Sequence, residues 1–469
     1  MPKIVFPVSH SPGLRASEGA GRLYNCYAEP MGEGGRAAAV RHRSPGLVNF
    51  GTTARTGCRG FIEVGGTLYV AFSGKLEKFT SAGGASTNVG NLNGTKKGFF
   101  ARNNATTPDK VFVDPDGNIA TFTPSAVTNS FDSDLPAVNS VAQLDGYFIF
   151  TTGNGQIWAT DLNAVTVNPL SFTTDQNSGG LLRGVTWGGR YYAFGNKATG
   201  VYVDAGTSPF PLARNEVIPR GIGGPYCVTG HEDNFSKALH IIGDDNAVYR
   251  LDGYTPTKVS PPDLDTLIEA VSDKTTLEMC SYISRGHAFI QITCPAWTWV
   301  LNLNNGKWHE RPSYSLTYSR ITQTYYAFGK WLCGDALTGN VQQISSAIHQ
   351  EIGNPMTCEV WSAPLQDFPQ RSRGASAFFD FAVGVGDAEG EDPIATDPEA
   401  EISYSVDGGE TFSIPRVRKL GRQSLGKTRV RVNQIKAAGA QGYIFKVRMS
   451  DPVHFGLMGG ELVGGPRAP

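Results

Sequence analysis

Short apolar runs, rich in aromatic and β-branched residues, alternate with Gly- and Asp-containing turns along most of the chain. From about residue 58 one unit recurs, in which a turn, an aromatic-rich run, a short polar turn and a second apolar run follow each other. Runs of this length and composition predict strands rather than helices. The recurring units are spaced 36 to 49 residues apart, with a mean of 43, at the anchors Leu68, Phe112, Phe148, Tyr192, Ile241, Phe289 and Tyr326.

A strand repeat of this length is typical of propeller blades. A single hairpin cannot bury both of its faces, whereas blades stacked around an axis bury each sheet between two neighbours. The last copy is short, so either an N-terminal strand completes it or it is an exit hairpin. We therefore predict an all-β fold in which residues 58–349 form a β-propeller of six or seven blades. A long β-sandwich or two barrels are the alternatives.

The two ends of the chain follow other patterns. Residues 1–57 contain only two short apolar runs, RLYNCYAEP and RSPGLVNF, and we expect an arm that packs on the body. Residues 350–469 contain four strand-like runs and predict a second domain, a C-terminal β-sandwich for docking or as a platform. The acidic stretch 387–400 predicts a solvated loop, with a cation site as the alternative. The one helix expected covers residues 264–280, after the breaker SPPD.

Composition limits the classes of function. The net charge of −1 does not call for a nucleic acid or an anionic membrane as the main partner. Seven scattered Cys without a CxxC pair predict buried, reduced thiols. The N-terminus has no signal-peptide pattern, and no apolar run approaches the roughly 20 residues that span a bilayer.

Motifs that carry chemistry are missing from the sequence. None of the eight His has a metal-ligand spacing, and the chain contains no GxSxG motif and no phosphate-binding loop. A Gly-rich stretch around Gly384 is not followed by a helix pattern, so it does not predict a phosphate site. We therefore expect no catalytic residue, no metal, no cofactor and no enzymatic activity.

One motif does predict a defined local structure. The segment SVDGGETF, residues 405–412, matches the Asp-box pattern S-x-D-x-G-x-T-[WF]. In such a turn the aspartate accepts hydrogen bonds from backbone N–H groups, the glycines allow positive φ, and the aromatic residue faces the core. The motif predicts a structural turn, made by Ser405, Asp407, Gly408, Gly409, Thr411 and Phe412.

A basic strip follows the Asp box. Between residues 416 and 432 the chain carries seven cationic side chains and no acidic one, and these are Arg416, Arg418, Lys419, Arg422, Lys427, Arg429 and Arg431. The strip predicts either a solvated strand–turn–strand face or a surface that docks a partner or faces DNA.

The order of these motifs resembles a known family. The Asp box, the basic strip and a strand ending in Arg448, Ser450, Asp451 and Pro452 resemble the C-terminal end of tail hub (nozzle) proteins of short-tailed phages, also called packaged-DNA stabilisation proteins. The family often has Trp where this chain has Phe412. The N-terminal segments with the same resemblance contain Asn25, Tyr27, Ala28 and Glu29, then Ser44, Pro45, Gly46 and Leu47, then Arg59, Gly60 and residues 67–70.

The resemblance implies a structural protein of the virion, made in the host cytoplasm. It implies a homo-oligomeric ring, with six copies, that lies below the portal and the head-to-tail adaptor protein. Such a ring continues the DNA channel, retains the packaged genome, surrounds the phage DNA transiently during ejection, and anchors a tail fibre or spike, without inserting into a membrane itself.

Two other functions stay open at this stage. One is a carbohydrate-binding or sialidase-like propeller protein, and the other is a soluble interaction propeller. Sialidase-like chains repeat the Asp box across several blades, whereas this chain has one copy outside the predicted blades. That difference favours the structural protein.

Overall fold

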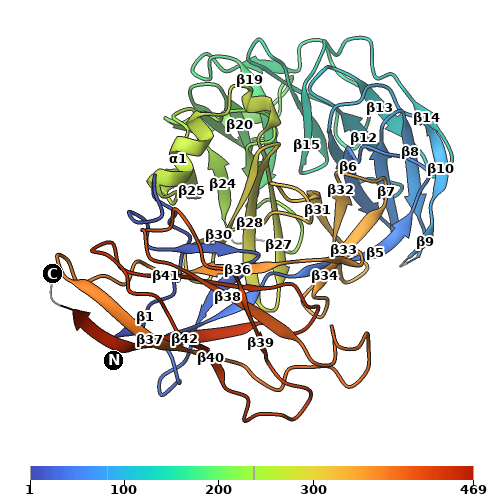
Figure 1. Ribbon diagram of the computed structural model, residues 1–469. Coiled ribbons are helices and arrows are strands. Elements are labelled where there is room, and N and C mark those ends of the chain that lie inside the picture. The colour runs from blue at the N-terminus through green and yellow to red at the C-terminus, as the bar shows by residue number, and fades with distance from the viewer. Residues whose placement is uncertain (1, 82, 236–237, 468–469) are drawn as a thin grey trace.

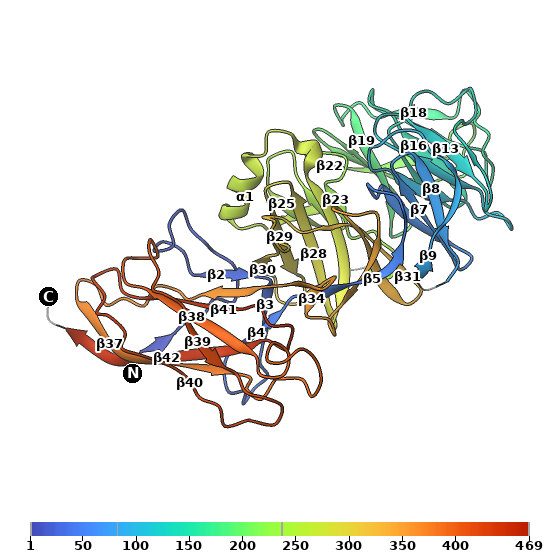
Figure 2. The same cartoon turned by 45° about the vertical axis from the view of Figure 1, so that its right-hand side comes forward.

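The computed structural model describes residues 2–81, 83–235 and 238–467. It contains a seven-bladed β-propeller and a β-sandwich that lie side by side along an elongated molecule (Figures 1 and 2). The predicted fold class is thereby confirmed, with seven blades. Among the described residues, no helix is long and apolar enough to cross a membrane.

Blades 1 to 5 are antiparallel four-stranded sheets, built from consecutive strands except that blade 1 omits β9, which pairs with β5 in blade 7. From the inner strand outward, blade 1 consists of β6 (Gly60–Val64), β7 (Thr67–Phe72), β8 (Lys75–Phe79) and β10 (Thr87–Asn91), and blade 2 of β11 (Phe99–Arg102), β12 (Lys110–Val113), β13 (Ile119–Phe122) and β14 (Val127–Thr128). Blade 3 consists of β15 (Ser140–Leu144), β16 (Tyr147–Thr151), β17 (Gln156–Ala159) and β18 (Phe172–Thr174), and blade 4 of β19 (Leu181–Trp187), β20 (Arg190–Gly195), β21 (Thr199–Asp204) and β22 (Leu212–Ile218). Blade 5 consists of β23 (Val228–Thr229), β24 (Leu239–Ile242), β25 (Val248–Asp252) and β26 (Thr255–Lys258).

Blades 6 and 7 recruit strands from elsewhere in the chain. Blade 6 consists of β27 (Glu278–Ser284), β28 (His287–Cys294), β29 (Trp297–Asn302) and β30 (Lys307–Glu310). Blade 7 consists of β31 (Ile321–Ala327), β32 (Lys330–Asp335), β33 (Val341–Ser345) and the N-terminal strand β5 (Gly46–Thr52), extended by β34 (Gln350–Glu351), β35 (Asn354–Pro355) and β9 (Gly84–Ala85). An N-terminal strand therefore completes the short last repeat.

The blades are apolar on both faces because each is packed between two neighbours. In β28, for example, seven of the eight residues are buried, so both faces of the strand are covered. The ring closes where the inner strand β31 contacts β6. Five blades join their first two strands by a two-residue turn with positive φ at both positions, the type I′ geometry that suits a twisted hairpin. These turns are Gly65-Gly66, Asp145-Gly146, Gly188-Gly189, Arg285-Gly286 and Phe328-Gly329.

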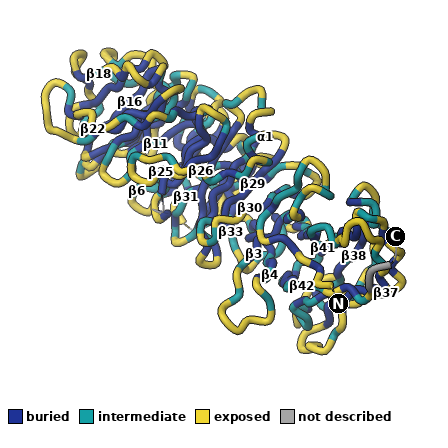
Figure 3. The backbone as a smooth tube through the Cα atoms, turned by 90° about the vertical axis from the view of Figure 1, so that its left-hand side faces the viewer, coloured by how far each residue is buried: buried dark blue, intermediate teal, exposed yellow. Residues whose placement is uncertain are grey.

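The sandwich is built from both ends of the chain. One sheet contains β1 (Lys3–Ile4), β3 (Cys26–Pro30), β4 (Ala39–Arg43), β42 (Gly456–Arg467), β37 (Arg371–Phe381) and β40 (Val430–Asn433). The other contains β2 (Arg22–Tyr24), β36 (Cys358–Trp361), β41 (Ile444–Met449), β38 (Glu399–Ser405) and β39 (Arg416–Lys419). One apolar core lies between them, and Figure 3 shows the buried backbone of the two domains in sequence along the molecule. The expected arm, residues 1–57, is thus divided between the sandwich and blade 7.

A continuous sheet joins the two domains. Strand β2 pairs in parallel with β30, through Tyr24 and Glu310, and antiparallel with β36. The sheet of blade 6 thereby continues into the sandwich as one nine-stranded sheet, from β27 at the propeller axis to β39 at the edge of the sandwich. The joint between the domains is made of backbone hydrogen bonds as well as side-chain packing.

Two sequence-based details are corrected by the structure. The helix expected over residues 264–280 is only α1 (Pro262–Glu269), followed by the short 3-10 turn η1 (Lys274–Thr276). The Asp273 side chain accepts a hydrogen bond from the Thr275 N–H, which favours a turn over a longer helix, and β27 begins at Glu278. The last repeat anchor, Tyr326, lies in the first strand of its blade, whereas the other anchors lie in second strands; its equivalent is Leu332 in β32.

Candidate docking surface

The Asp-box residues form one turn at the end of β38. The Ser405 Oγ donates to Asp407 Oδ1 over 2.6 Å and accepts from the Gly409 N–H over 2.8 Å. Asp407 in turn accepts from the Thr411 N–H over 3.0 Å. These hydrogen bonds, first the one from Ser405 and then those from Thr411, lower the pKa of Asp407 to about 2. Gly408 and Gly409 have φ of +77° and +95°, where a side chain is strained.

The turn also holds the N-terminal segment in place. A Cβ atom at Gly409 would lie 2.6 Å from the Cβ of Ala16, so the glycine permits close contact between the two ends of the chain. Phe412 is half-buried and packs edge-on against Trp361 at 4.7 Å, with the Lys446 ammonium over its ring at 4.3 Å. The expectation that Phe412 faces the core is wrong, because its ring lies outside the buried core of the sandwich.

The basic strip does not form one uniform surface. It begins in β39, crosses the edge of the sandwich and ends in β40 of the other sheet. Arg416 and Arg418 donate to the backbone carbonyls of Gln434 and Arg431, over 3.1 and 2.6 Å. These guanidinium groups donate hydrogen bonds to carbonyl groups at the edge of β40. Because those carbonyl groups are then already paired, the edge strand is protected against pairing with a strand of another chain.

The middle of the strip is paired with the acidic segment. Lys419 Nζ lies 2.6 Å from Asp397 Oδ2, and Arg422 lies 3.5 Å from Asp392 and 3.9 Å from Asp397. Residues 387–392 are exposed, as expected of a loop, whereas Asp397 is buried. Among the residues that the structure describes, no group of three or more His, Cys, Asp or Glu is arranged to hold a metal ion.

The last part of the strip faces outward. Lys427, Arg429 and Arg431 are exposed, and the Arg431 guanidinium lies over the Phe378 ring at 4.9 Å. Beside them lies a groove of about 350 Å³, lined by Arg429, Phe378 and, from the N-terminal segment, Arg36.

The contribution of Arg36 to this groove was not predicted from the sequence. Its Nε donates to Asp380 Oδ2 over 3.2 Å, a contact between residues 344 positions apart. No local pattern in the sequence identifies a contact of this range. The outward cationic face is defined here as Arg36, from outside the strip, together with the exposed residues Lys427, Arg429 and Arg431 at the end of the strip.

Histidines from both domains meet at the junction between propeller and sandwich. Glu29 Oε2 lies 3.6 Å from His42 Nε2 in the sandwich and 3.4 Å from His287 Nε2 in the propeller. Burial, with the nearby Arg285 as the next cause, lowers the pKa of His42 to about 4. Burial, with Arg311 as the next cause, lowers the pKa of His309 to about 3. His42 and His309 are therefore neutral at pH 7 and pack as part of the structure.

All seven cysteine side chains are buried, which confirms the expectation of buried thiols. Burial raises the pKa of Cys58 and of Cys227 to about 12. Both thiols are protonated at neutral pH and are poor nucleophiles, because the thiolate is the reactive form.

Comparison with protein families identifies the origin of this fold. The family model described as "Bacteriophage P22 Gp10, beta-propeller" matches residues 23–349, which run from β2 through blade 7. The chain belongs to this family. The resemblance to packaged-DNA stabilisation proteins is thus confirmed, and the P22 Gp10 propeller family places the chain among structural proteins of phages.

Solved structures offer more distant likenesses to this member of the P22 Gp10 family. The WD40 β-propeller domain of Doa1 has a TM-score of 0.42 and 8% identity, over 64% of this chain and 96% of that one. BamB from Moraxella catarrhalis has a TM-score of 0.38 and 14% identity, over 68% and 93%. The extracellular domain of BT4673 from B. thetaiotaomicron has a TM-score of 0.44 and 10% identity, over 74% and 47%. The search of curated proteins found no match.

Proposed function

We propose that the protein is the hub, or nozzle, subunit of a short phage tail and that it has no catalytic role. Membership of the P22 Gp10 propeller family supports a structural role in the phage. In this proposal, copies of the subunit form a closed ring of six through heterologous contacts, because such contacts either close into a ring or continue into a fibre. The ring continues the DNA channel below the adaptor, retains the packaged genome and anchors a fibre or spike.

The nine-stranded sheet is the observation that carries this proposal. It links the inner strand of blade 6 to the free edge of the sandwich without a break in the strand pairing. A subunit joined in this way resists bending between its domains, because bending would break backbone hydrogen bonds of β2. A tail component must transmit force between its neighbours, and this joint suits that task.

The outward cationic face is the proposed contact with a neighbouring tail protein. Each phosphate neutralised by a cationic side chain adds salt-dependent affinity, so a strongly basic channel would slow the passage of DNA. The net charge of −1 suits a channel that grips the genome weakly. Arg36, Lys427, Arg429 and Arg431 then serve better as a docking surface than as part of the channel wall.

Complementation of a phage whose copy of this gene carries an early stop codon tests the proposal. Particles without the protein are expected to package DNA and then lose it, and the wild-type protein is expected to restore genome retention. The double variant Arg429→Ala, Arg431→Ala should fold but fail to join the tail, while Arg214→Ala, an exposed arginine on β22, should behave as wild type. Electron microscopy and nuclease protection of the genome report both steps.

Two outcomes would contradict this account. Infectious particles that lack the protein would rule out a role as tail hub. If tails assemble with the double variant but leak DNA, the two arginines do not dock a partner and instead act as a gate in the channel.

A further inference from the structure

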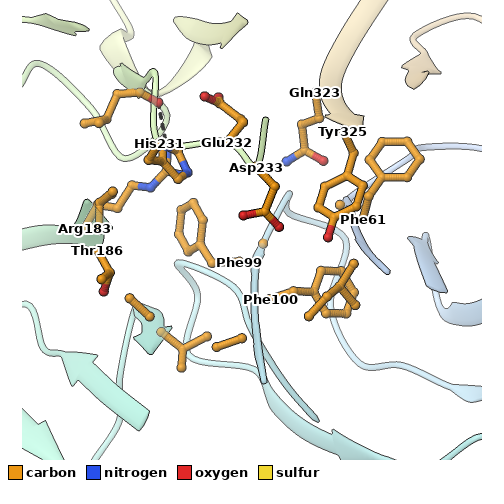
Figure 4. A pocket seen from close by; sticks show the side chains of 18 of the residues that line it. Phe61, Phe99, Phe100, Arg183, Thr186, His231, Glu232, Asp233, Gln323 and Tyr325 are labelled. Atoms are coloured by element: carbon orange, nitrogen blue, oxygen red, sulfur yellow. Dashed lines mark hydrogen bonds between the residues drawn. The ribbon is translucent and has the colours of Figure 1, made fainter. Parts of the chain in front are cut away.

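The propeller and the sandwich each contain a hollow, and the two hollows differ in the charges around them. The seven inner strands of the propeller enclose a cavity of about 450 Å³ on the axis (Figure 4). Its exposed charged residues are Asp233 and Arg102, one of each sign, so this cavity favours neither an acidic nor a basic partner. The groove of about 350 Å³ in the sandwich has a surplus of cations beside it instead.

The lining of this groove includes apolar side chains that stay accessible. Phe378 in β37 and Val383, which follows that strand, both line the groove and are only half-buried. The Arg431 guanidinium covers one face of the Phe378 ring at 4.9 Å, and the rest of the side chain borders the groove. An apolar side chain of a partner can therefore remove apolar surface from water here, which favours binding.

The rim of the groove carries cations that the subunit itself does not pair. The one acidic residue in the lining, Asp380, accepts from Arg36 Nε over 3.2 Å and is thereby neutralised. Arg429 also lines the groove, and Lys427 lies two residues before it. Both are exposed, and neither has an ion-pair partner among the described residues. The groove thus suits a segment that carries carboxylates next to an apolar side chain.

The same sandwich carries a segment of this composition. Residues 387–394, here called the acidic loop, are all exposed and contain four carboxylates and the apolar Ile394, which is 40% exposed. One of the carboxylates, Asp392, lies 3.5 Å from Arg422. The other three have no ion-pair partner in the described part of the chain, and they are Asp387, Glu389 and Glu391.

Backbone hydrogen bonds give the acidic loop a closed shape. The Asp387 N–H donates to the Ala395 carbonyl over 2.9 Å, and the Ala395 N–H donates to the Glu391 carbonyl over 2.7 Å. A loop that is shaped in advance loses less conformational freedom when it binds. In this shape none of its three unpaired carboxylates forms an ion pair with Lys427 or Arg429 of the same copy, so both sets of charges remain available to another molecule.

We propose that the acidic loop of one copy docks on the cationic groove of a second copy. Ile394 then packs against Phe378, and the unpaired carboxylates of the loop face Lys427 and Arg429. Because the loop and the groove are different surfaces, the contact is heterologous and can repeat from copy to copy until a ring closes. This inference rests on the proposed tail hub, since it names the neighbouring copy as the partner of the outward cationic face.

Charge reversal on each surface tests the contact. The groove variant is Lys427→Glu, Arg429→Glu, and the loop variant is Glu389→Lys, Glu391→Lys. Either variant alone places like charges at every contact, which repel each other across an interface. Each should need a protein concentration at least about a hundredfold higher than wild type for half-assembly in analytical ultracentrifugation. The control Arg214→Glu, which reverses an exposed charge on β22, should assemble like wild type.

An equimolar mixture of the two variants is the decisive sample. In the mixture the unchanged loop of one variant meets the unchanged groove of the other, and the two reversed surfaces also match. Rings of alternating copies should therefore form at the wild-type concentration, which would show as well that both variants are folded. Added NaCl should weaken the wild-type assembly, because salt screens exposed charges.

Several results would overturn the contact. These are folded variants that each assemble like wild type, a mixture that stays as dissociated as its components, and wild-type protein that stays monomeric. The first of these would reject only this contact and leave the ring intact, whereas a monomeric wild type would contradict the ring as well. A pair of copies that is lost in each variant and recovered in the mixture would support the contact and contradict a ring of six. Infectious particles that lack the protein would reject the tail function but not a contact that the mixture restores.

Discussion

At the residue scale, Asp407 stabilises its turn as a hydrogen-bond acceptor. It is the acceptor for Ser405 Oγ and for the Thr411 N–H, and the turn packs against the N-terminal segment at Ala16. The role of this residue is therefore to fix the end of β38, and the turn contributes to the stability of the sandwich rather than to chemistry.

Replacement of Asp407 tests this role. Asp407→Ala is expected to lower the free energy of unfolding of the sandwich by roughly 1–3 kcal/mol, because turn amides and hydroxyls lose their acceptor. The exposed neighbour Glu410 provides a matched control, since Glu410→Ala removes a carboxylate from the same loop without removing this acceptor. Urea unfolding, followed by fluorescence, measures the stability of both variants. Equal stability of Asp407→Ala and wild type would show that the Asp407 carboxylate does not stabilise the turn.

The buried histidines at the domain junction give the protein an acid sensitivity. In the folded state the pKa of His309 is about 3 and that of His42 is about 4, whereas an unfolded histidine has a pKa near 6.5. Between these values the unfolded chain binds more protons than the folded one, so stability rises with pH. The contribution is complete above about pH 6.5 and is lost as the pH falls toward 4.

Melting temperatures between pH 7.5 and 5 check this expectation. The wild-type protein should become less stable over this range, with His309 contributing a slope of at most about 1.4 kcal/mol per pH unit. His309→Gln cannot titrate and should show a smaller slope. Identical slopes for the two proteins would mean that His309 is not held neutral by burial.

At the scale of elements, the propeller depends on β5 for its closure. This strand pairs with β33, where Leu47 lies opposite Ile344, and Leu47 is 1% exposed. Without β5, blade 7 would have an unpaired edge and its buried face would meet water. The N-terminal segment is thus part of the propeller core as well as of the sandwich.

Two leucines of the N-terminal segment test this dependence. Leu47→Ala should destabilise the propeller by about 2–5 kcal/mol, the usual range for a buried leucine. Leu14→Ala should have little effect, because Leu14 is 92% exposed. Thermal unfolding of both variants gives the comparison, and a small effect at Leu47 would show that β5 does not hold the ring closed.

The same elements show what the sequence could predict. The central hairpins of the blades were predictable because turn residues such as Gly65 and Gly66 and the apolar runs beside them act locally. The use of β5 in blade 7 and of β2 as the link between domains was not, since these pairings join distant segments. For the same reason Arg36, which contacts Asp380, was absent from the predicted docking strip. The Asp-box turn itself was predictable, whereas the half-buried position of Phe412, against Trp361 of another strand, was not.

At the scale of the whole molecule, the two domains form one elongated body that is linked by the nine-stranded sheet (Figure 2). The propeller carries the axial cavity, and the sandwich carries the outward cationic face beside β37 and β40 of its other sheet. In the proposed ring, the sandwich face contacts a neighbouring tail protein. Ring formation is the claim on which the tail function depends.

Mass photometry of the purified full chain, with negative-stain images of the same sample, tests that claim most directly. The subunit mass is 50.3 kDa, and the account predicts a closed ring with a mass six times as large, seen end-on as a circle with a central channel. A different closed number would keep the ring and change only its copy number. A single species of 50.3 kDa up to micromolar concentrations, with images of isolated propellers, would contradict the account.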